Sequence, residues 1–517
     1  MTQRIELRTT PKIAATPELL KAEAARAAAL PKERIVRVDI VRRSIDARQR
    51  KVMVNLSLLL HIDEVDESAL EVAVPEYPDV HDAPQAIVVG AGPAGLFAAL
   101  ELVEAGIKPI VLERGKDVDA RRLDMAAISR EGRVDPESNY CFGEGGAGAY
   151  SDGKLYTRSK KRGPTEKVLR ILHAHGAQAE ILVDAHPHIG TDRLPKVIKA
   201  IRETIIRAGG EVHFRTRVDD LVLSADGHRC TGVVDSEGRV WEGPVILATG
   251  HSARDVYHLL LRRGVDLEAK GIAVGVRLEH PQELIDRIQY HSDEGRGKYL
   301  PAAEYSMLTR VDGRAVYSFC MCPGGYIIPA ASGPGQLVVN GMSPANRGTR
   351  WANSGMVVEI LPEDVPGNDP LRIMHYQEAI EKRFFEASGG SQKAPAQRMT
   401  DFVDGRDSKD LPRSSYPPGV FAARIDRLLP EPVSRRLQAG FREFGRKSRG
   451  FLSPEAILVG DETRTSAPVR IPRDDESLNH RSIEGLYPCG EGAGYAGGIV
   501  SAAVDGIRCA RALAEKQ

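Results

Sequence analysis

Six consecutive residues near position 90 have the composition of a phosphate-binding turn. Residues 90–95 read Gly-Ala-Gly-Pro-Ala-Gly, with glycines at Gly90, Gly92 and Gly95 and with Pro93 and Ala94 between the last two. In such a segment the first glycine permits a tight turn, the second lets the backbone approach a pyrophosphate, and the third lets a helix pack closely on a strand. The free N–H groups at the start of the helix would bind the phosphates. The spacing predicts a dinucleotide site.

A carboxylate follows where the ribose of such a ligand would need one. Glu113 comes 18 residues after Gly95 and ends an apolar run. From that position it could accept hydrogen bonds from both ribose hydroxyls, and it would repel a 2′-phosphate. We therefore expect FAD or NAD rather than NADP, and we include the neighbouring Arg114 in the predicted site.

Two cysteines separated by one residue could do redox chemistry. Cys320 and Cys322 are the only two of the six cysteines that lie close together in sequence. On an extended strand, this spacing sends both side chains to one face, but redox-active pairs usually have a longer spacing, on or near a helix. A catalytic thiol role stays open beside the favoured alternative, two small apolar residues that line a core or a substrate cavity.

Other polar residues are candidates for substrate or metal contacts. Arg464 and Arg470 could clamp a substrate carboxylate through bidentate hydrogen bonds, and a structural ion pair with neighbouring acids is an equal alternative. His186 and His188 have a spacing compatible with metal ligation. No third ligand is evident near them in the sequence, so we predict no metal site.

Regular elements must hold these residues in place. Residues 86–89 are an apolar, β-branched run typical of a strand buried in a parallel sheet. Apolar residues at helical spacing follow the glycine turn, and residues 109–113 form a second strand that ends on Glu113. A glycine pattern alone arises often by chance. Strand, turn, helix and strand together predict a Rossmann-type unit.

Two distant segments favour FAD over NAD, because FAD is long and needs contacts far from the first unit. Residues 245–250 form an apolar strand ending in Ala248, Thr249 and Gly250, after a hairpin-like stretch that begins at Val218. This strand resembles the ATG strand of two-dinucleotide-binding flavoproteins. Residues 485–503 resemble their C-terminal flavin motif, where an acidic residue binds the ribityl hydroxyls and the next helix points at the isoalloxazine. Glu491 replaces the usual Asp. The predicted contacts of this motif to non-covalent FAD are Gly490, Glu491, Gly492, Gly497, Gly498 and Ile499.

A glycine-rich segment extends the resemblance over nearly the whole chain. Residues 139–155, taken with residues 44–48, 188–192, 320–325 and 462–465, resemble a bacterial family of uncharacterised FAD-dependent dehydrogenases with the glutathione-reductase-like FAD fold. The resemblance implies a flavin domain interrupted by a substrate domain, with the glycine loop near the flavin.

The loop could bind pyrophosphate or the flavin carbonyl edge through its backbone N–H groups. Lys154 could stabilise negative charge on reduced flavin, and a solvated surface turn is the alternative. The predicted loop contacts are Gly145, Gly146, Ala147, Gly148, Ser151, Asp152 and Gly153.

The patterns divide the chain into four segments. Residues 1–80 predict a small α+β domain with a hairpin around Asp46 to Arg48. Residues 81–270 and 471–517 predict the two parts of a Rossmann-type α/β FAD-binding domain with a parallel sheet. Residues 271–470 show alternating strands joined by Pro-Gly-Gly and Gly-Pro-Gly turns, and they predict an antiparallel β-rich substrate domain.

Composition bears on partners and compartment. Lys plus Arg equal Asp plus Glu at 71 each, so no net charge draws the chain toward nucleic acid or anionic lipid. We expect no membrane span and no signal peptide, and the sparse cysteines suit a reducing, cytoplasmic compartment. Residues 32–51 carry eight basic residues and three acidic ones. A solvated hairpin face is favoured there over an RNA-facing patch.

The expected function is that of an FAD-dependent oxidoreductase. A dehydrogenase or reductase would transfer a hydride between an unidentified small-molecule substrate and flavin N5, with the protein supplying orientation and electrostatics. Lys154, Cys320, Cys322 and Arg464 are the candidate catalytic residues. NADH or NADPH is a candidate transient reductant, because only one dinucleotide fingerprint occurs. The alternatives are a flavin-containing RNA-modifying or RNA-binding protein and a non-catalytic FAD scaffold.

Overall fold

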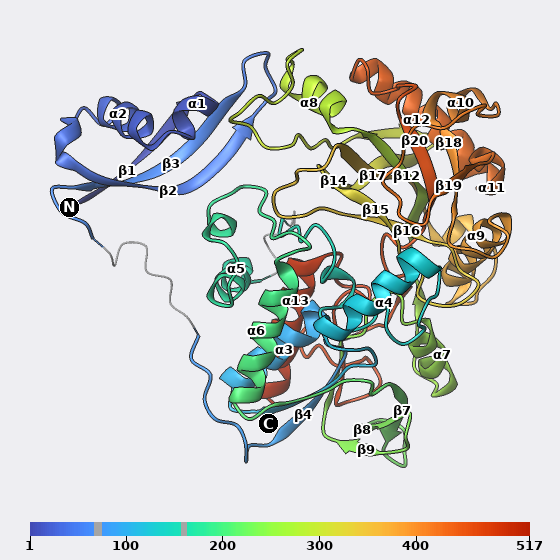
Figure 1. Cartoon of the computed structure of the whole chain (residues 1–517). Coiled ribbons are helices and arrows are strands. Elements are labelled where there is room, and N and C mark those ends of the chain that lie inside the picture. Colours follow the sequence, from blue (N-terminus) through green and yellow to red (C-terminus); the bar gives the residue numbers. More distant parts are fainter. Residues whose placement is uncertain (67–74, 157–162, 517) are drawn as a thin grey trace.

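A computed structural model describes residues 1–66, 75–156 and 163–516 (Figure 1). Its N-terminal unit is an antiparallel sheet ordered β1-β3-β2 that carries helices on one face. The alternate residues Val54 to Ile62 of its central strand are buried, and Leu20 of α2 belongs to the same core. The elements of this unit are β1 (Thr2–Thr9), α1 (Pro11–Ala14), α2 (Pro17–Ala27), η1 (Lys32–Arg34), β2 (Ile35–Asp46) and β3 (Met53–Ile62).

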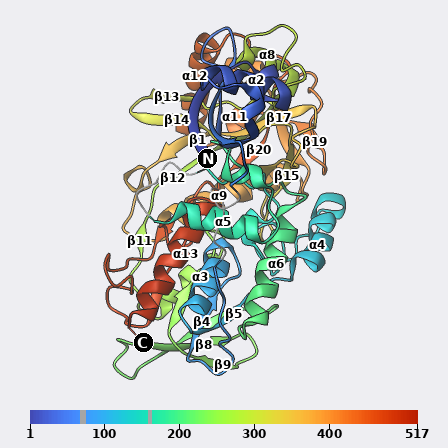
Figure 2. The ribbon, with the colours of Figure 1, turned by 90° about the vertical axis from the view of Figure 1, so that its left-hand side faces the viewer.

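The second unit is built on a parallel sheet ordered β22-β10-β4-β5-β6. Helix α3 packs between α13 and α6 on one face (Figures 1 and 2), and the small sheet β7-β8-β9 shares a core with the other face. The elements are β4 (Gln85–Val89), α3 (Pro93–Glu104), β5 (Lys108–Leu112), α4 (Val118–Glu131), η3 (Gly146–Gly148), α5 (Thr165–Ala174), η5 (Ala179–Leu182), α6 (Leu194–Arg207), β6 (Glu211–His213), β7 (Val218–Leu223), β8 (Cys230–Asp235), β9 (Val240–Glu242), β10 (Val245–Leu247), α7 (Arg254–Arg262), β22 (Leu486–Pro488) and α13 (Ile499–Ala514).

The third unit is a seven-stranded sheet ordered β13-β14-β17-β12-β20-β18-β19. Helix α12 lies so close to it that a Cβ on Gly440 would stand 2.7 Å from Val316 of β14. The elements are β12 (Ile272–Pro281), α8 (Gln282–Tyr290), β13 (Leu308–Val311), β14 (Arg314–Cys322), β15 (Tyr326–Pro329), β16 (Val339–Met342), β17 (Trp351–Ile360), η6 (Pro362–Asp364), α9 (Arg372–Ala387), β18 (Ala394–Arg398), α10 (Met399–Asp404), β19 (Val420–Ala422), α11 (Ile425–Leu428), α12 (Glu431–Lys447) and β20 (Ile457–Glu462).

The directions of the paired strands test the expected parallel and antiparallel sheets. The α/β class with a parallel sheet is confirmed, because every pair in the five-stranded sheet is parallel. The seven-stranded sheet is antiparallel except at its edge, where β18 and β19 run parallel. A short antiparallel pair, β11 (Glu268–Ala269) with β21 (Val469–Arg470), forms where the chain passes between the second and third units.

Among the described residues, no helix combines the length and the apolar character needed to cross a membrane.

One local expectation is wrong. Cys320 and Cys322 do not lie on a regular extended strand, because Cys320 has a positive φ of 44°. The pairing of β14 with β17 shifts between Phe319 and Cys322, so this end of β14 is bulged. A bulge of this kind re-aims side chains and is common next to functional sites.

Candidate active site

A cavity of about 460 Å³ is lined by residues from both the parallel sheet and the seven-stranded unit. The strand ends and turns after β4, β5 and β10 supply one wall, where ligands bind in open α/β sheets. The second unit contributes residues that include Val89, Gly90, Gly92, Leu112, Glu113, Cys141, Phe142, Thr216, Ala248, Thr249, Gly250, His251, Ser252 and Asp255, and the third contributes Phe319, Cys320, Asn340, Arg464 and Thr465.

The three fingerprint glycines have different surroundings. A Cβ on Gly90, which has φ 104°, would stand 2.8 Å from the carbonyl oxygen of Ala248, and one on Gly95 would stand 1.8 Å from the carbonyl oxygen of Gly90. A Cβ on Gly92 would meet nothing closer than the Cα of Gly146 at 4.0 Å. Gly90 and Gly95 therefore shape the turn, and Gly92 keeps the cavity open.

The glycine loop after α4 is fixed by Arg121, which is fully buried. Its guanidinium donates hydrogen bonds of 2.7–2.9 Å to four carbonyl oxygens, those of Asn139, Tyr140, Glu144 and Gly146. These bonds hold the segment around Gly146 against the Gly90 turn. Sequence reasoning missed Arg121, because nothing in its local pattern distinguishes it from the surface arginines of α4.

Glu113 also fixes backbone at this site. Its carboxylate accepts N–H groups from Ala91 at 2.9 Å, Gly115 at 2.8 Å and Gly143 at 3.0 Å. It therefore joins the phosphate turn to the glycine loop, a structural role that the sequence did not reveal. Since the same residue lines the cavity, the predicted ribose contact stays a prediction.

The glycines of the C-terminal motif fall into the same two groups as those of the Gly90 turn: some leave the cavity open and others pack closely against backbone. A Cβ on Gly497 or Gly498 would meet nothing within 4 Å, whereas one on Gly492 would stand 2.1 Å from the carbonyl oxygen of Thr249. Gly490 does not line the cavity, and its N–H donates to Asp505 at 2.8 Å. Glu491 lines the cavity, and burial raises its pKa to about 7, against the opposing charge of Lys270.

Ion pairs dominate the wall opposite the glycine turns. Arg464 lines the cavity, but its guanidinium lies 3.0 Å from the Glu381 carboxylate, which Arg254 also contacts at 2.8 Å. Burial acts to raise the pKa of Glu381, but Arg254 and Arg464 outweigh it and hold that pKa at about 2. Two roles were expected for Arg464, a structural ion pair or a clamp for a substrate carboxylate. The structure shows the ion pair, with Glu381. Arg470 does not line this cavity.

Lys154 belongs to a second network on this wall. Its Nζ lies 3.6 Å from the Asp152 carboxylate, which also binds Arg347 at 2.7 Å. His186 pairs with Glu304, and His188 Nε2 lies 3.0 Å from the carbonyl oxygen of Ala345. The two histidines thus have separate partners.

Most of the residues predicted from the sequence line the cavity. Those that do not are Gly95, Gly145, Gly490 and Gly492, which pack the turns, Cys322, which is buried, and Arg470, His186 and His188. The lining residues are Gly90, Gly92, Pro93, Ala94, Glu113, Arg114, Gly146, Ala147, Gly148, Ser151, Asp152, Gly153, Lys154, Val218, Ala248, Thr249, Gly250, Cys320, Arg464, Glu491, Gly497, Gly498 and Ile499.

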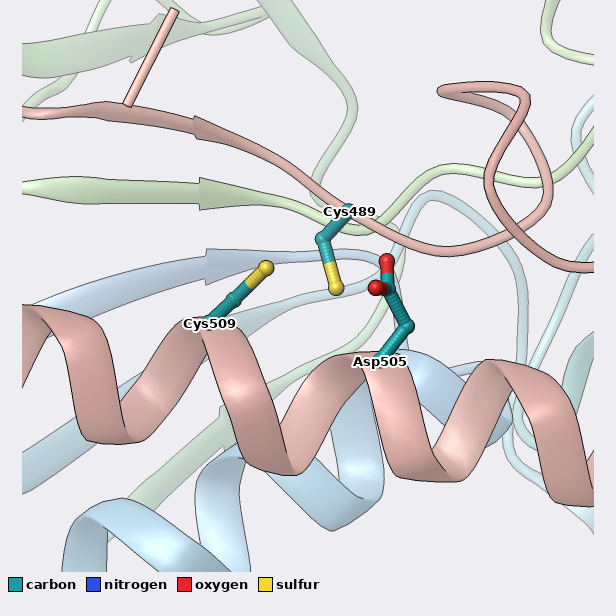
Figure 3. Close-up of side chains that lie close together, drawn as sticks. All are labelled: Cys489, Asp505 and Cys509. Atoms are coloured by element: carbon teal, nitrogen blue, oxygen red, sulfur yellow. The ribbon is translucent and has the colours of Figure 1, made fainter. Parts of the chain in front are cut away.

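A buried thiol cluster lies outside the cavity. Among the described residues, Cys489, Asp505 and Cys509 form the one group whose ligand atoms lie close enough for a metal, within 4.8 Å of one another (Figure 3). Arg473 already contacts this group, at 2.6 Å from the Asp505 carboxylate and 3.3 Å from the Cys509 sulfur. A guanidinium there supplies the positive charge, so we assign the cluster a structural role that joins α13 to the end of β22.

The cavity fits FAD on its own geometry. Four glycines, Gly92, Gly250, Gly497 and Gly498, leave it open, because a side chain on any of them would extend into space with no neighbour closer than 4.0 Å. The N-termini of α3 and α13 both reach the wall, and helix N-termini favour phosphate and other anionic groups.

Comparison with known sequences agrees with this site. Residues 83–122 match the family profile of an FAD binding domain, residues 271–465 match the C-terminal-domain-like part of FAD-dependent proteins, and residues 1–61 match a domain of unknown function. An uncharacterized protein of Clostridium beijerinckii is 45% identical over 507 residues, which cover 94% of each chain.

More distant relatives match only in part. The probable electron transfer flavoprotein-quinone oxidoreductase YdiS of Escherichia coli is 28% identical over 217 residues, or 41% of this chain and 47% of that protein. The flavin-dependent brominase Bmp2 covers 83% of this chain and 78% of its own, at 12% identity and a TM-score of 0.37, a likeness too low to carry an argument. The chain belongs to the same family as the C. beijerinckii protein, and it is an FAD-dependent flavoprotein oxidoreductase.

Proposed function

We propose that the protein is a dehydrogenase or reductase that transfers a hydride between a small-molecule substrate and N5 of the flavin. One observation carries the proposal: the cavity that begins at the Gly90 turn continues to Phe319, Cys320 and Asn340 of the third unit. A ligand that fills it would touch polar side chains at its far end. Bound FAD supplies two-electron redox chemistry there.

The chain's own residues would bind and orient the cofactor. The N–H groups at the start of α3 suit a pyrophosphate, and those at the start of α13, which follows Gly498, suit the carbonyl edge of an isoalloxazine. Glu491 lies in the same wall. With a pKa of about 7, its carboxyl can hold or release a proton near neutral pH, where acid–base groups are most effective.

Electron donors test this proposal directly. The FAD-loaded protein is mixed anaerobically with NADH, NADPH and a panel of small alcohols, amines and hydroxy acids, and the absorbance of oxidised flavin is followed. We expect at least one donor to bleach the flavin faster than it bleaches free FAD. A flavin that dithionite reduces but no donor reduces would contradict the proposal and favour a scaffold role.

The RNA-binding alternative gains no support from the hairpin of residues 32–51. Arg43 binds Asp184 at 2.7 Å, Arg48 binds Asp46 at 2.8 Å, and Arg34 binds Asp63 at 2.6 Å. A phosphate would have to displace these carboxylates. We therefore keep the redox proposal alone.

A further inference from the structure

Two thiols meet at the far end of the cavity. Cys320 lines the cavity wall, and Cys322, two residues further along the chain, is buried. The Cys322 sulfur lies 3.3 Å from the carbonyl oxygen of Cys320, to which its thiol donates a hydrogen bond. Cys320 therefore faces the cofactor space, and the Cys322 sulfur lies against the backbone of Cys320.

The backbone at this point is strained. Cys320 has φ 44°, a left-handed conformation that costs a residue with a Cβ about 1–3 kcal/mol. Two small apolar side chains in a regular strand would not need it. In the pairing of β14 with β17, Phe319 opposes Gly355 and Cys322 opposes Asn353, so Cys320 and Met321 lie in the bulge. Strain of this kind gathers at functional sites, where surrounding contacts maintain it.

Two cations converge on the Cys322 sulfur. Arg277 lies on β12, and its Nη2 is 3.3 Å from the Cys322 sulfur and 2.6 Å from the carbonyl oxygen of Cys320. The Nζ of Lys154 lies 4.0 Å from the Cys322 sulfur. These charges favour one thiolate in the pair: the interaction with Cys322, followed by the charges of Lys154 and Arg277, lowers the pKa of Cys320 well below its ordinary value, and the same interaction raises the pKa of Cys322. A thiolate is the reactive form of cysteine in redox exchange.

The carboxylates beside Arg277 and Lys154 do not cancel the positive charge that stabilises this thiolate. The Glu462 carboxylate lies 2.9 Å from Arg277, but burial raises the pKa of Glu462 to about 7, against the charge of Arg277. Near neutral pH, Glu462 is thus in part a neutral acid, and the Arg277 charge is then balanced by the sulfur. Asp152 shares its charge between Lys154 and Arg347.

We propose that Cys320 and Cys322 form a redox-active dithiol that exchanges an electron pair with the bound flavin. The inference rests on the proposed function and adds a second redox centre to the same site. In the reducing direction, the Cys320–Cys322 disulfide bond breaks, and it receives an electron pair and one proton from the anionic reduced flavin. The products are the Cys320 thiolate, the Cys322 thiol and oxidised FAD, so charge and protons balance.

The direction follows from the charges. Lys154 and Arg277 stabilise the thiolate and hence the reduced pair, and a stabilised reduced form makes a disulfide a stronger oxidant. A disulfide closed across a single residue is also strained, and strain acts in the same direction. The disulfide is therefore an acceptor for electrons from reduced flavin.

Electron counting tests the proposal without any substrate. The FAD-loaded protein is oxidised with diamide, desalted and titrated anaerobically with dithionite. We expect four electrons per FAD for the wild type and two for Cys320→Ser and Cys322→Ser. Two electrons per FAD in the wild type would overturn the proposal. If donors reduce the flavin while the count is two, only the dithiol fails; if the count is four but no donor reduces the flavin, only the hydride-transfer proposal fails.

Mass spectrometry provides a readout that needs no variant to fold. After diamide, the wild-type peptide with both cysteines should be lighter by two hydrogen atoms and should resist alkylation; equal alkylation before and after diamide would contradict the proposal. Cys509→Ser is the matched control, because it removes the other close thiol pair (Figure 3) and should retain the four-electron uptake.

The cation is tested by the pH dependence of alkylation. Lys154→Met removes one charge near the sulfurs, so the pH at which Cys320 reacts with iodoacetamide should rise. An unchanged pH profile would show that Lys154 does not stabilise the thiolate.

Discussion

The two walls of the cavity are built from different kinds of atoms. The wall at the Gly90 turn presents glycines and backbone N–H groups, and its shape depends on close approaches such as that of Gly95 to Gly90. The opposite wall presents charged side chains such as Arg464, which is paired with the buried Glu381 of α9. Under the proposed function, one wall would recognise the cofactor by fit, whereas the other would set the charge around the reacting atoms.

The largest expected effect concerns Arg277, which is fully buried outside the cavity and contacts Cys320 of the charged wall and the buried Cys322. Arg277→Met should lower the free energy of unfolding by about 3–5 kcal/mol, because it removes a buried guanidinium that donates to Asn353, to Glu462 and to the carbonyl oxygen of Cys320. Chemical denaturation measures this change. The matched control is Arg435→Met, since Arg435 is 58% exposed in its pair with Asp312, where such pairs contribute about 1 kcal/mol or less. Equal losses in both variants would remove the contrast between a buried and a surface pair.

Two substitutions in the glycine wall should separate an effect on protein stability from an effect on FAD affinity. Gly95→Ala should destabilise the apoprotein by about 3 kcal/mol, because overpacking of this kind forces the backbone apart. Gly92→Val should leave the unfolding of the apoprotein nearly unchanged and weaken FAD binding about 100-fold, or ~2.7 kcal/mol. Fluorescence titration of apoprotein with FAD measures the second effect. Normal FAD binding by Gly92→Val would refute the assignment of Gly92 to the open wall.

Glu491 makes stability depend on pH. Its pKa is about 7 in the folded chain and 4.5 ordinarily, so the folded state holds the proton more tightly. The resulting stabilisation is complete below the ordinary value and is lost as pH rises toward 7. It amounts to about 3 kcal/mol. Glu491→Gln should flatten this part of the pH–stability curve of the apoprotein, and an unchanged slope would contradict the assignment.

The smallest effect is expected far from the cavity. Arg43→Ala removes the ion pair between β2 and Asp184, whose side chains are 37% and 31% exposed. Such partly screened pairs contribute about 1 kcal/mol or less, so the melting temperature should fall only slightly. A large fall would show that this contact holds the N-terminal unit in place.

The sequence predicted the two walls unequally. Sequence reasoning found the wall at the glycine turns because its motifs are short runs of consecutive residues. These are the Gly90 turn with Glu113 and the segments around Thr249 and Gly498. Arg121, Arg277 and Glu381 were missed, because each acquires its role from partners more than fifteen residues away in the chain. The bulge at Cys320 was also missed, since a backbone irregularity in a strand has no signature in residue type when the residue is not glycine.

A crystal structure with FAD bound tests the account most directly. We expect the pyrophosphate to lie against Gly92 and the start of α3, and the isoalloxazine to lie between the start of α13 and the wall that carries Lys154 and Cys320. An isoalloxazine that points away from the seven-stranded unit, with no contact to Cys320 or Asn340, would contradict the claim that the two walls form one redox site.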